Sequence, residues 1–298
     1  MRLPATLALI AIVVLPTAAA AEPVEPAAFK ALARPAPTTV LRYGTAASQA
    51  VDLFLPQGSG PHPVAILIHG GCWRNLPGAG REQLRHIGAE LASQGIAVWG
   101  IGYRRADEVG GGYPGTFADV GLAIDWLRSD AGRYSLDVSR SVIVGHSAGG
   151  HLALWAAARN RLPAASPLRR TEPFMPRTVI SLAGIGDLQA FARFVPILCG
   201  PGIIDRLVPA TGAASAYAET SPAELPAPSG EVVMISGILD RLVPPYVAHD
   251  YARAMQRKQT TIDLVEIPGA GHFDLVTPGT EAWEKVKGRI AAALTPAP

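Results

Sequence analysis

The chain has 298 residues, of which 49% are hydrophobic and 17% charged, a composition that excludes a disordered chain. Its 26 lysines and arginines nearly balance 24 aspartates and glutamates, for a formal net charge of +2. This balance excludes a protein whose main task is binding nucleic acid. The two cysteines are too few for a disulfide-rich scaffold or a four-cysteine zinc site.

The first 21 residues have the pattern of a secretory signal peptide. Arg2 is followed by an apolar run at residues 7–15 and by small residues up to Ala21. The run is shorter than the roughly 20 residues that cross a bilayer, so a retained membrane anchor is the weaker alternative. We expect cleavage near Ala21, export to the periplasm or the medium, and no stable membrane span in the mature chain.

The rest of the chain is predicted to form one α/β domain, residues 38–298, after a Pro- and Ala-rich leader at residues 22–37 that we expect to be extended. Short apolar runs alternate with amphipathic stretches, which predicts strands alternating with helices. The predicted strands are residues 51–55, 64–68, 96–101, 141–144, 179–182, 232–235 and 261–267; the predicted helices are residues 82–94, 117–129, 148–159, 246–258 and 281–294.

This alternation predicts a mainly parallel sheet with helices on both faces. Residues 51–55 alternate apolar and polar side chains, which is typical of an antiparallel edge strand. Ligands of such sheets bind at the carboxyl ends of the strands. Residues 187–228, after the strand predicted at residues 179–182, are too long for a plain connection, so we expect a small cap over the site, with a disordered insertion as the alternative.

A nucleophile is predicted at Ser147. Residues 145–149 read Gly-His-Ser-Ala-Gly, directly after a predicted strand and before a predicted helix, which is the context that the Gly-x-Ser-x-Gly turn requires. A sharp turn of this kind exposes the serine hydroxyl, and the flanking glycines avoid collisions with the neighbouring strand and helix.

The loop at residues 69–73, His-Gly-Gly-Cys-Trp, is predicted to supply part of an oxyanion hole. We expect one backbone N–H donor from Gly70 or Gly71 and a second from Ala148, the residue after the nucleophile. His69 is expected to fix this loop by hydrogen bonding. Trp73 is either a wall of the substrate pocket or a core aromatic, and the further candidates for pocket walls are Tyr103, Phe191 and Phe194.

The general base is predicted to be His272, which lies in a Gly-rich loop after the last long strand. Asp240, which follows the preceding strand, is expected to accept its N–H and to fix the tautomer. Asp187 is the alternative partner, or instead ties down the cap. No metal site is predicted. Cys72 and Cys199 either pair and link the loop to the cap or remain two thiols, because the sequence does not give their separation.

Taken together, these residues resemble the α/β-hydrolase superfamily. The nearest branches are the serine esterases similar to hormone-sensitive lipase, to kynurenine formamidase and to feruloyl and acetyl-xylan (BD-FAE-like) esterases. The motifs that carry the resemblance are residues 69–73, 102–104, Asp119 with 126–127, 145–152, 221–222, Asp240 and 272–274. The resemblance covers residues 38–295. Cys72 departs from it, because relatives often carry an aromatic residue there.

The resemblance implies hydrolysis of an ester or a formamide by a serine triad without a cofactor. Our interpretation is a short-chain carboxylesterase that acts on a small-molecule ester through an acyl-enzyme. A kynurenine formamidase-like hydrolase is the first alternative, although export argues against an intracellular metabolite as substrate. A peptidase and a non-catalytic binding protein of the same fold are weaker alternatives; the latter usually lacks a triad residue.

Overall fold

The computed structural model describes residues 22–210 and 216–295. The predicted signal peptide, residues 1–21, lies outside the described residues. Among the helices of the described ranges, none has both the length and the apolarity needed to cross a membrane.

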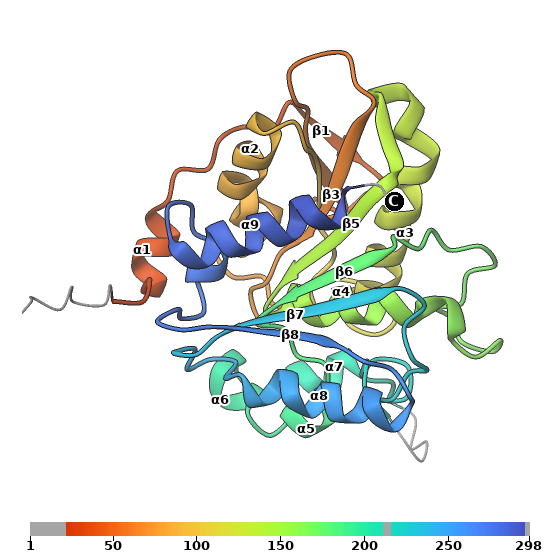
Figure 1. The fold of residues 1–298 in the computed structure, drawn as a ribbon. Helices are drawn as coiled ribbons and strands as arrows, with labels where there is room; N and C mark the ends of the chain where they lie inside the picture. The colour runs from red at the N-terminus through yellow and green to blue at the C-terminus, as the bar shows by residue number, and fades with distance from the viewer. Residues whose placement is uncertain (1–21, 211–215, 296–298) are drawn as a thin grey trace, which may run out of the picture.

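An eight-stranded sheet forms the centre of the molecule (Figure 1). The spatial order is β1-β2-β4-β3-β5-β6-β7-β8, in which β1 and β2 are antiparallel to their neighbours and the other pairs are parallel. The strands are β1 (Thr39–Arg42), β2 (Ala50–Phe54), β3 (His62–Ile68), β4 (Ala97–Ile101), β5 (Leu136–His146), β6 (Thr178–Leu182), β7 (Glu231–Gly237) and β8 (Asp263–Ile267). The predicted mainly parallel sheet is confirmed.

Two predictions about the amino-terminal part are wrong. The strand β2 is antiparallel but not at the edge, because the short strand β1 pairs outside it and Thr39 lies opposite Leu53. The leader is not wholly extended, since it contains helix α1 (Pro26–Ala31). Pro26 fits the first turn of a helix, where its missing N–H costs nothing. Phe29 on α1 is buried and anchors the leader to the domain.

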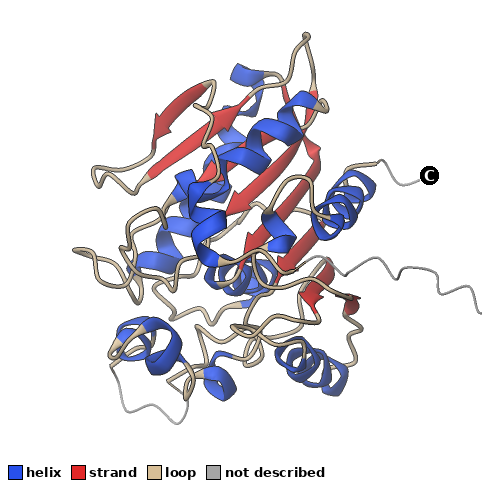
Figure 2. Cartoon of the chain, turned by 90° about the vertical axis from the view of Figure 1, so that its left-hand side faces the viewer, coloured by secondary structure: helices blue, strands red, loops and turns tan. Residues whose placement is uncertain are grey.

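Helices cover both faces of the sheet (Figures 1 and 2). On one face α2 (Arg85–Ser93) and α9 (Glu281–Ala293) lie side by side. Glu90 on α2 links them, since it accepts hydrogen bonds from Trp283 Nε1 at 2.8 Å and Lys287 Nζ at 2.6 Å on α9. On the other face α3 (Gly115–Asp130) packs against α4 (Ala148–Ala158), and α8 (Tyr246–Arg257) packs against β7 and β8. The core therefore has two layers with the sheet between them.

Three short helices occupy the predicted insertion between β6 and β7: α5 (Leu188–Phe191), α6 (Val195–Cys199) and α7 (Ile203–Leu207). They lie beside α8 below the sheet in the view of Figure 1. Val195, Ile203 and Leu207 are buried, whereas Ile197 is 81% exposed. The insertion thus adds buried side chains to the main core and leaves Ile197 exposed to solvent.

Candidate active site

Ser147 occupies a strained turn between β5 and α4. Its backbone lies at φ 56° and ψ −121°, a region that costs a non-glycine residue about 1–3 kcal/mol. The Ser147 N–H donates to the carbonyl oxygen of Leu182 on β6 at 2.8 Å. A Cβ on Gly145 would lie 2.1 Å from the Gly149 oxygen, and one on Gly149 would lie 2.1 Å from the Ile68 oxygen. Both glycines are therefore required for the chain to make this turn.

His272 and Asp240 form a buried hydrogen-bonded pair at the ends of β8 and β7. The His272 Nδ1–H donates to Asp240 Oδ2 at 2.7 Å, and the two residues are 7% and 3% exposed. The other carboxylate oxygen, Oδ1, accepts the backbone N–H groups of Leu242 and Val243, each at 2.8 Å. These bonds fix the carboxylate, which in turn orients the ring and leaves Nε2 as the proton acceptor.

His146 connects this pair to the serine turn. The imidazoles of His146 and His272 lie 4.6 Å apart, and His146 Nε2 is 3.0 Å from the His272 carbonyl oxygen. Burial and the nearby His272 lower the pKa of His146 well below its usual value, so His146 is neutral and Nε2–H is the donor. No hydrogen bond joins Ser147 to His272 among the described residues, and such bonds are often long until substrate binds.

The loop after β3 lies against Ser147. A Cβ on Gly70 would be 3.1 Å from Ser147 Cβ, which places the two backbones in contact. The Gly70 N–H donates to Gln83 Oε1 at 3.0 Å, whereas the Gly71 N–H has no acceptor among the described residues. Ala148, as the first residue of α4, has no intrahelical acceptor for its N–H. The geometry thus favours Gly71 over Gly70 as the donor that joins Ala148.

His69 holds the base of this loop. Its Nδ1 lies 2.8 Å from the Gly70 carbonyl oxygen, and its ring stacks on Tyr103 at 4.3 Å. Tyr103 Oη donates to the His69 carbonyl oxygen at 2.9 Å. Burial lowers the pKa of His69 to about 4, so its ring is neutral and Nδ1–H is the donor. The ring is therefore a fixed part of the loop.

Three of the four predicted pocket walls lie in the interior. Trp73 and Tyr103 are 1% and 0% exposed, and Phe191, on helix α5 of the cap, is 4% exposed. Trp73 Nε1 donates to His151 Nδ1 at 3.1 Å, and His151 Nε2–H donates to the Thr220 oxygen at 2.8 Å. The rings of these three residues pack in the core, and for Trp73 this is the second of the two predicted alternatives. Phe194 remains partly exposed on the cap.

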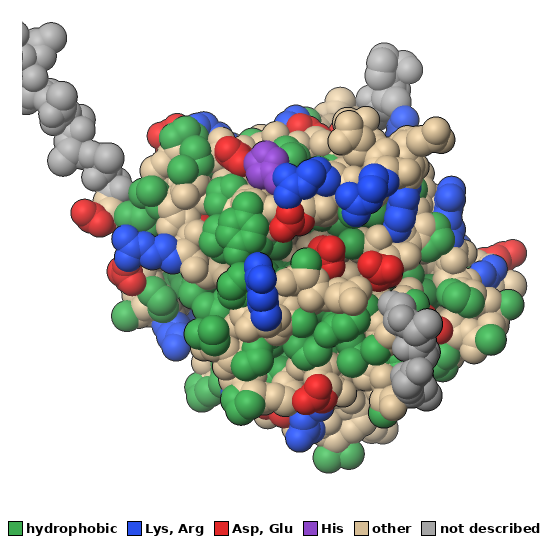
Figure 3. All heavy atoms as spheres, turned by 90° about the horizontal axis from the view of Figure 1, so that it is seen from below, with side chains coloured by type: hydrophobic (Ala, Val, Ile, Leu, Met, Phe, Trp, Pro, Cys, Tyr) green, Lys and Arg blue, Asp and Glu red, His purple; other side chains and the backbone are tan. Residues whose placement is uncertain are grey.

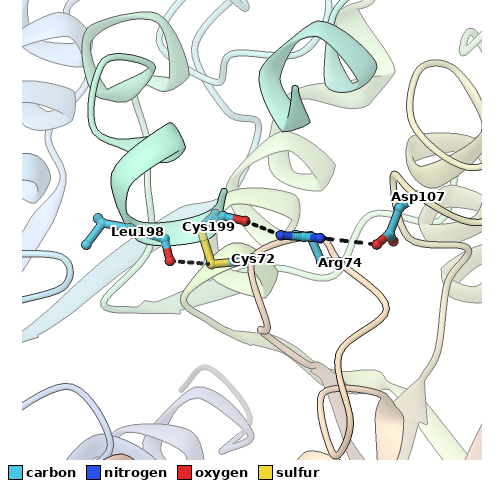
Figure 4. Close-up of a disulfide and its surroundings, with 5 residues drawn as sticks. All are labelled: Cys72, Arg74, Asp107, Leu198 and Cys199. Atoms are coloured by element: carbon cyan, nitrogen blue, oxygen red, sulfur yellow. Dashed lines mark hydrogen bonds and ion pairs between the residues drawn. A yellow bond between two sulfur atoms is a disulfide. The ribbon is translucent and has the colours of Figure 1, made fainter. Parts of the chain in front are cut away.

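The two cysteines form a disulfide that links the loop after β3 to helix α6 (Figure 4). The Cα atoms of Cys72 and Cys199 are 5.3 Å apart, and the residues are separated by 127 positions. Beside the disulfide, Arg74 Nη1 donates to the Cys199 carbonyl oxygen at 2.9 Å, and its Nε lies 3.6 Å from Asp107. The bridge and the arginine thus hold the loop and the cap together.

Asp187 is not the partner of His272. Its Oδ1 accepts the N–H of Ala190 at 2.9 Å and caps helix α5. Asp187 therefore holds the start of the cap, which is the second of the two roles predicted for it. No group of three or more His, Cys, Asp and Glu side chains within residues 22–210 and 216–295 is arranged to hold a metal ion.

Two supporting residues carry no clear signal in the sequence. Gln83 lies in a short 3-10 helix (Arg81–Leu84), and only the folded loop brings its amide to Gly70. Asp274 Oδ2 accepts the N–H of Gly271 at 3.0 Å and that of Val24 at 3.0 Å. Gly271 lies only three positions before Asp274, so their bond is local, whereas nothing in the sequence indicates the bond to Val24.

Comparison with known proteins agrees with this architecture. The chain is 28% identical to esterase LipC of Mycobacterium tuberculosis over 253 residues, which cover 78% of this chain and 59% of LipC; it thus spans less than two thirds of that relative. It is 31% identical to the kynurenine formamidase of Danio rerio over 116 residues, 37% of this chain and 35% of that enzyme.

The fold is shared with solved esterase structures. An inhibited esterase B from Lactobacillus rhamnosis aligns with a TM-score of 0.71 at 21% identity and covers 88% of each chain. At this identity the likeness shows the α/β-hydrolase fold alone. The family model described as BD-FAE matches residues 51–248, which is more than half of the chain. The chain therefore belongs to the BD-FAE family of α/β-hydrolases.

Proposed function

We propose that this protein is a serine carboxylesterase whose triad is Ser147, His272 and Asp240. The observation that carries the proposal is the 2.7 Å bond from His272 to Asp240, held next to the turn that exposes Ser147. The esterase names among its relatives support the reaction class.

In the proposed mechanism, His272 Nε2 takes the proton of Ser147 Oγ as the oxygen attacks the ester carbonyl. The N–H groups of Gly71 and Ala148 hold the negative charge that develops on the carbonyl oxygen. His272 then gives its proton to the departing alcohol, and Asp240 stabilises the imidazolium. Water, deprotonated by His272, attacks the acyl-enzyme, and the acid leaves as Ser147 regains its proton.

Short-chain carboxylic esters are the proposed substrates. A formamide remains the second candidate, because the 116 residues shared with the kynurenine formamidase of Danio rerio are 31% identical. We also propose that the protein is exported after cleavage near Ala21. The disulfide between Cys72 and Cys199 supports export, since such bonds persist in oxidising compartments.

The test compares wild type with Ser147→Ala in the hydrolysis of p-nitrophenyl acetate and butyrate at neutral pH. Loss of the nucleophile is expected to lower kcat by about 10⁶. Ser59→Ala is the matched control, because Ser59 is an exposed loop residue, and it keeps the wild-type rate. N-formylkynurenine and an aminoacyl-naphthylamide, measured in parallel, are expected to react much more slowly.

Equal rates for wild type and Ser147→Ala would contradict the triad. Faster turnover of N-formylkynurenine than of the esters, lost in Ser147→Ala, would instead establish the formamidase. No turnover of any of these substrates, together with no reaction of Ser147 with a fluorophosphonate probe, would favour a binding protein.

A further inference from the structure

A groove of about 530 Å³ lies beside the His272–Asp240 pair, within the range of about 300–1,000 Å³ that is typical of small-molecule sites. One wall is the leader and the other is formed by the loops after β7 and β8. The groove is lined by residues 22–26, 238–242 and 271–273. None of Ser147, Gly71 and Ala148 lines it, so the groove extends from the histidine side of the site alone.

The leader wall is attached to the loop that carries His272. The Val24 N–H donates to Asp274 Oδ2, which also accepts the Gly271 N–H. A Cβ on Gly271 would lie 2.8 Å from Pro23 Cβ, so the leader packs directly on the residue before His272. Farther along, Phe29 stacks on Phe273 at 4.6 Å. The wall is thus a fixed part of the domain.

More than half of the exposed surface of the groove is apolar, and its rim also carries the charged residues Glu22, Glu25 and Arg241. Ile238, Leu239 and Leu242 are 46%, 48% and 37% exposed, and Pro23 and Val24 face them across the groove. Clustered apolar side chains left in water beside a reactive pair indicate a binding surface. Figure 3, which views the molecule from the side of α5 to α8, shows hydrophobic side chains gathered in patches between charged ones. The ligand that fits this groove is apolar.

The position of the groove indicates which half of the substrate it holds. In the proposed mechanism His272 delivers a proton to the departing alcohol oxygen, so the alcohol half must lie beside His272. The carbonyl oxygen faces Gly71 and Ala148, which do not line the groove. We propose that this groove is the alcohol subsite and that it takes an apolar, uncharged alcohol. This inference rests on the proposed function.

Two isomeric esters separate the alcohol half from the acyl half. Hexyl acetate and ethyl hexanoate have the same composition, and ethyl acetate is the short reference; acid release is followed at constant pH. Each buried methylene is expected to raise kcat/KM about three- to four-fold. For wild type we expect hexyl acetate to exceed ethyl acetate by at least ten-fold.

The variant Val24→Ser/Leu239→Ser removes apolar surface from both walls and keeps the Val24 N–H. We expect the ratio of kcat/KM for hexyl acetate to that for ethyl acetate to fall about ten-fold, while the ratio for ethyl hexanoate to ethyl acetate stays the same. Val109→Ser, at a side chain that is 97% exposed and outside the groove, is the control and keeps both ratios. Unfolding in urea checks that all variants fold.

Three results would overturn the inference. The first is that wild type hydrolyses ethyl acetate without any preference for hexyl acetate. The second is that the double variant lowers both ratios equally. The third is that the double variant lowers only the ethyl hexanoate ratio, which would place the acyl half in the groove. Failure of the proposed function looks different, because then no ester is hydrolysed or Ser147→Ala matches wild type.

Discussion

The two sides of the candidate active site are held in different ways. On the nucleophile side, Gly145 and Gly149 let backbone pack on backbone, and a side chain at either would collide with carbonyl groups. On the oxyanion side, residues 71–73 all have positive φ, although only Gly71 is a glycine. This loop is held by side chains, namely the Gln83 amide and the disulfide from Cys72 to Cys199. The first side is fixed by packing, whereas the second depends on individual bonds that substitution removes one at a time.

The largest effect is expected for Gly149→Ala. The new Cβ would lie 2.1 Å from the Ile68 oxygen and 2.5 Å from the His69 oxygen, and neither backbone group is able to move away. We expect a loss of more than about 4 kcal/mol in the free energy of unfolding, measured by urea denaturation, or no folded protein. Gly288→Ala is the control: Gly288 is exposed on α9 with no heavy atom near its Cβ position, so stability should rise by about 0.5–1 kcal/mol. A Gly149→Ala protein with wild-type stability would show that the turn is adjustable.

We expect substitutions of Asp240 and Asp187 to have different effects, the first on activity and the second on stability. Asp240→Asn keeps the shape of the side chain but disturbs the tautomer of His272, so kcat on p-nitrophenyl acetate should fall by about 10⁴. Asp187→Ala removes the cap of α5 and should lower stability by about 0.5–2 kcal/mol, with a far smaller change in kcat. A large loss of kcat in Asp187→Ala with little change in Asp240→Asn would reverse the assignment.

The oxyanion side is tested by removing its bridge. Cys72→Ser/Cys199→Ser opens a link between residues 127 positions apart, and the free energy of unfolding should fall by about 2–5 kcal/mol. Wild type measured with a reductant should approach the double variant, while the double variant itself should not respond to the reductant. Equal stability of the oxidised wild type and the double variant would show that Arg74 and the packing of the cap are enough to hold the loop.

The comparison of the two sides also explains what the sequence could predict. The turn at Ser147 and the parallel strands are predictable, because a buried strand, a glycine-flanked serine and a following helix are encoded within a short stretch. The pairing of His272 with Asp240 followed from their order and from the edge at which parallel strands end. Local pattern and backbone geometry therefore sufficed for the nucleophile side.

Contacts between segments that are distant in the sequence could not be predicted from local patterns. Val24 and Asp274 are separated by 250 positions, and neither residue type indicates that they bond. The sequence does not assign Trp73 and Tyr103 to a pocket wall or to the core, because an aromatic side chain next to a reactive loop fits both equally well. Strand β1 is not predicted from the sequence because its side chains alternate between partly buried and exposed, which leaves no long apolar run.

The smallest predicted effect concerns two neutral histidines, His69 in the loop after β3 and His151 on α4, which bonds to Trp73 of that loop. Burial lowers the pKa of His69 and of His151 to about 4 in the folded protein, from an ordinary value of 6.5. The unfolded chain therefore binds more protons than the folded one between these two values, so stability must fall as the pH drops below about 6.5. One pKa unit corresponds to about 1.4 kcal/mol. Each of the two histidines should thus lower the free energy of unfolding by about 1 kcal/mol when the pH falls from 7.5 to 5.5.

Urea denaturation at both pH values measures this loss, and His151→Gln tests its origin. Glutamine is able to accept from Trp73 Nε1 and to donate to the Thr220 oxygen, as His151 does, but it takes up no proton in this range. The variant should therefore lose about 1 kcal/mol less than wild type on acidification. If the two proteins lose the same free energy, His151 is protonated equally in the folded and unfolded chains, and the link from Trp73 to Thr220 does not depend on a neutral ring.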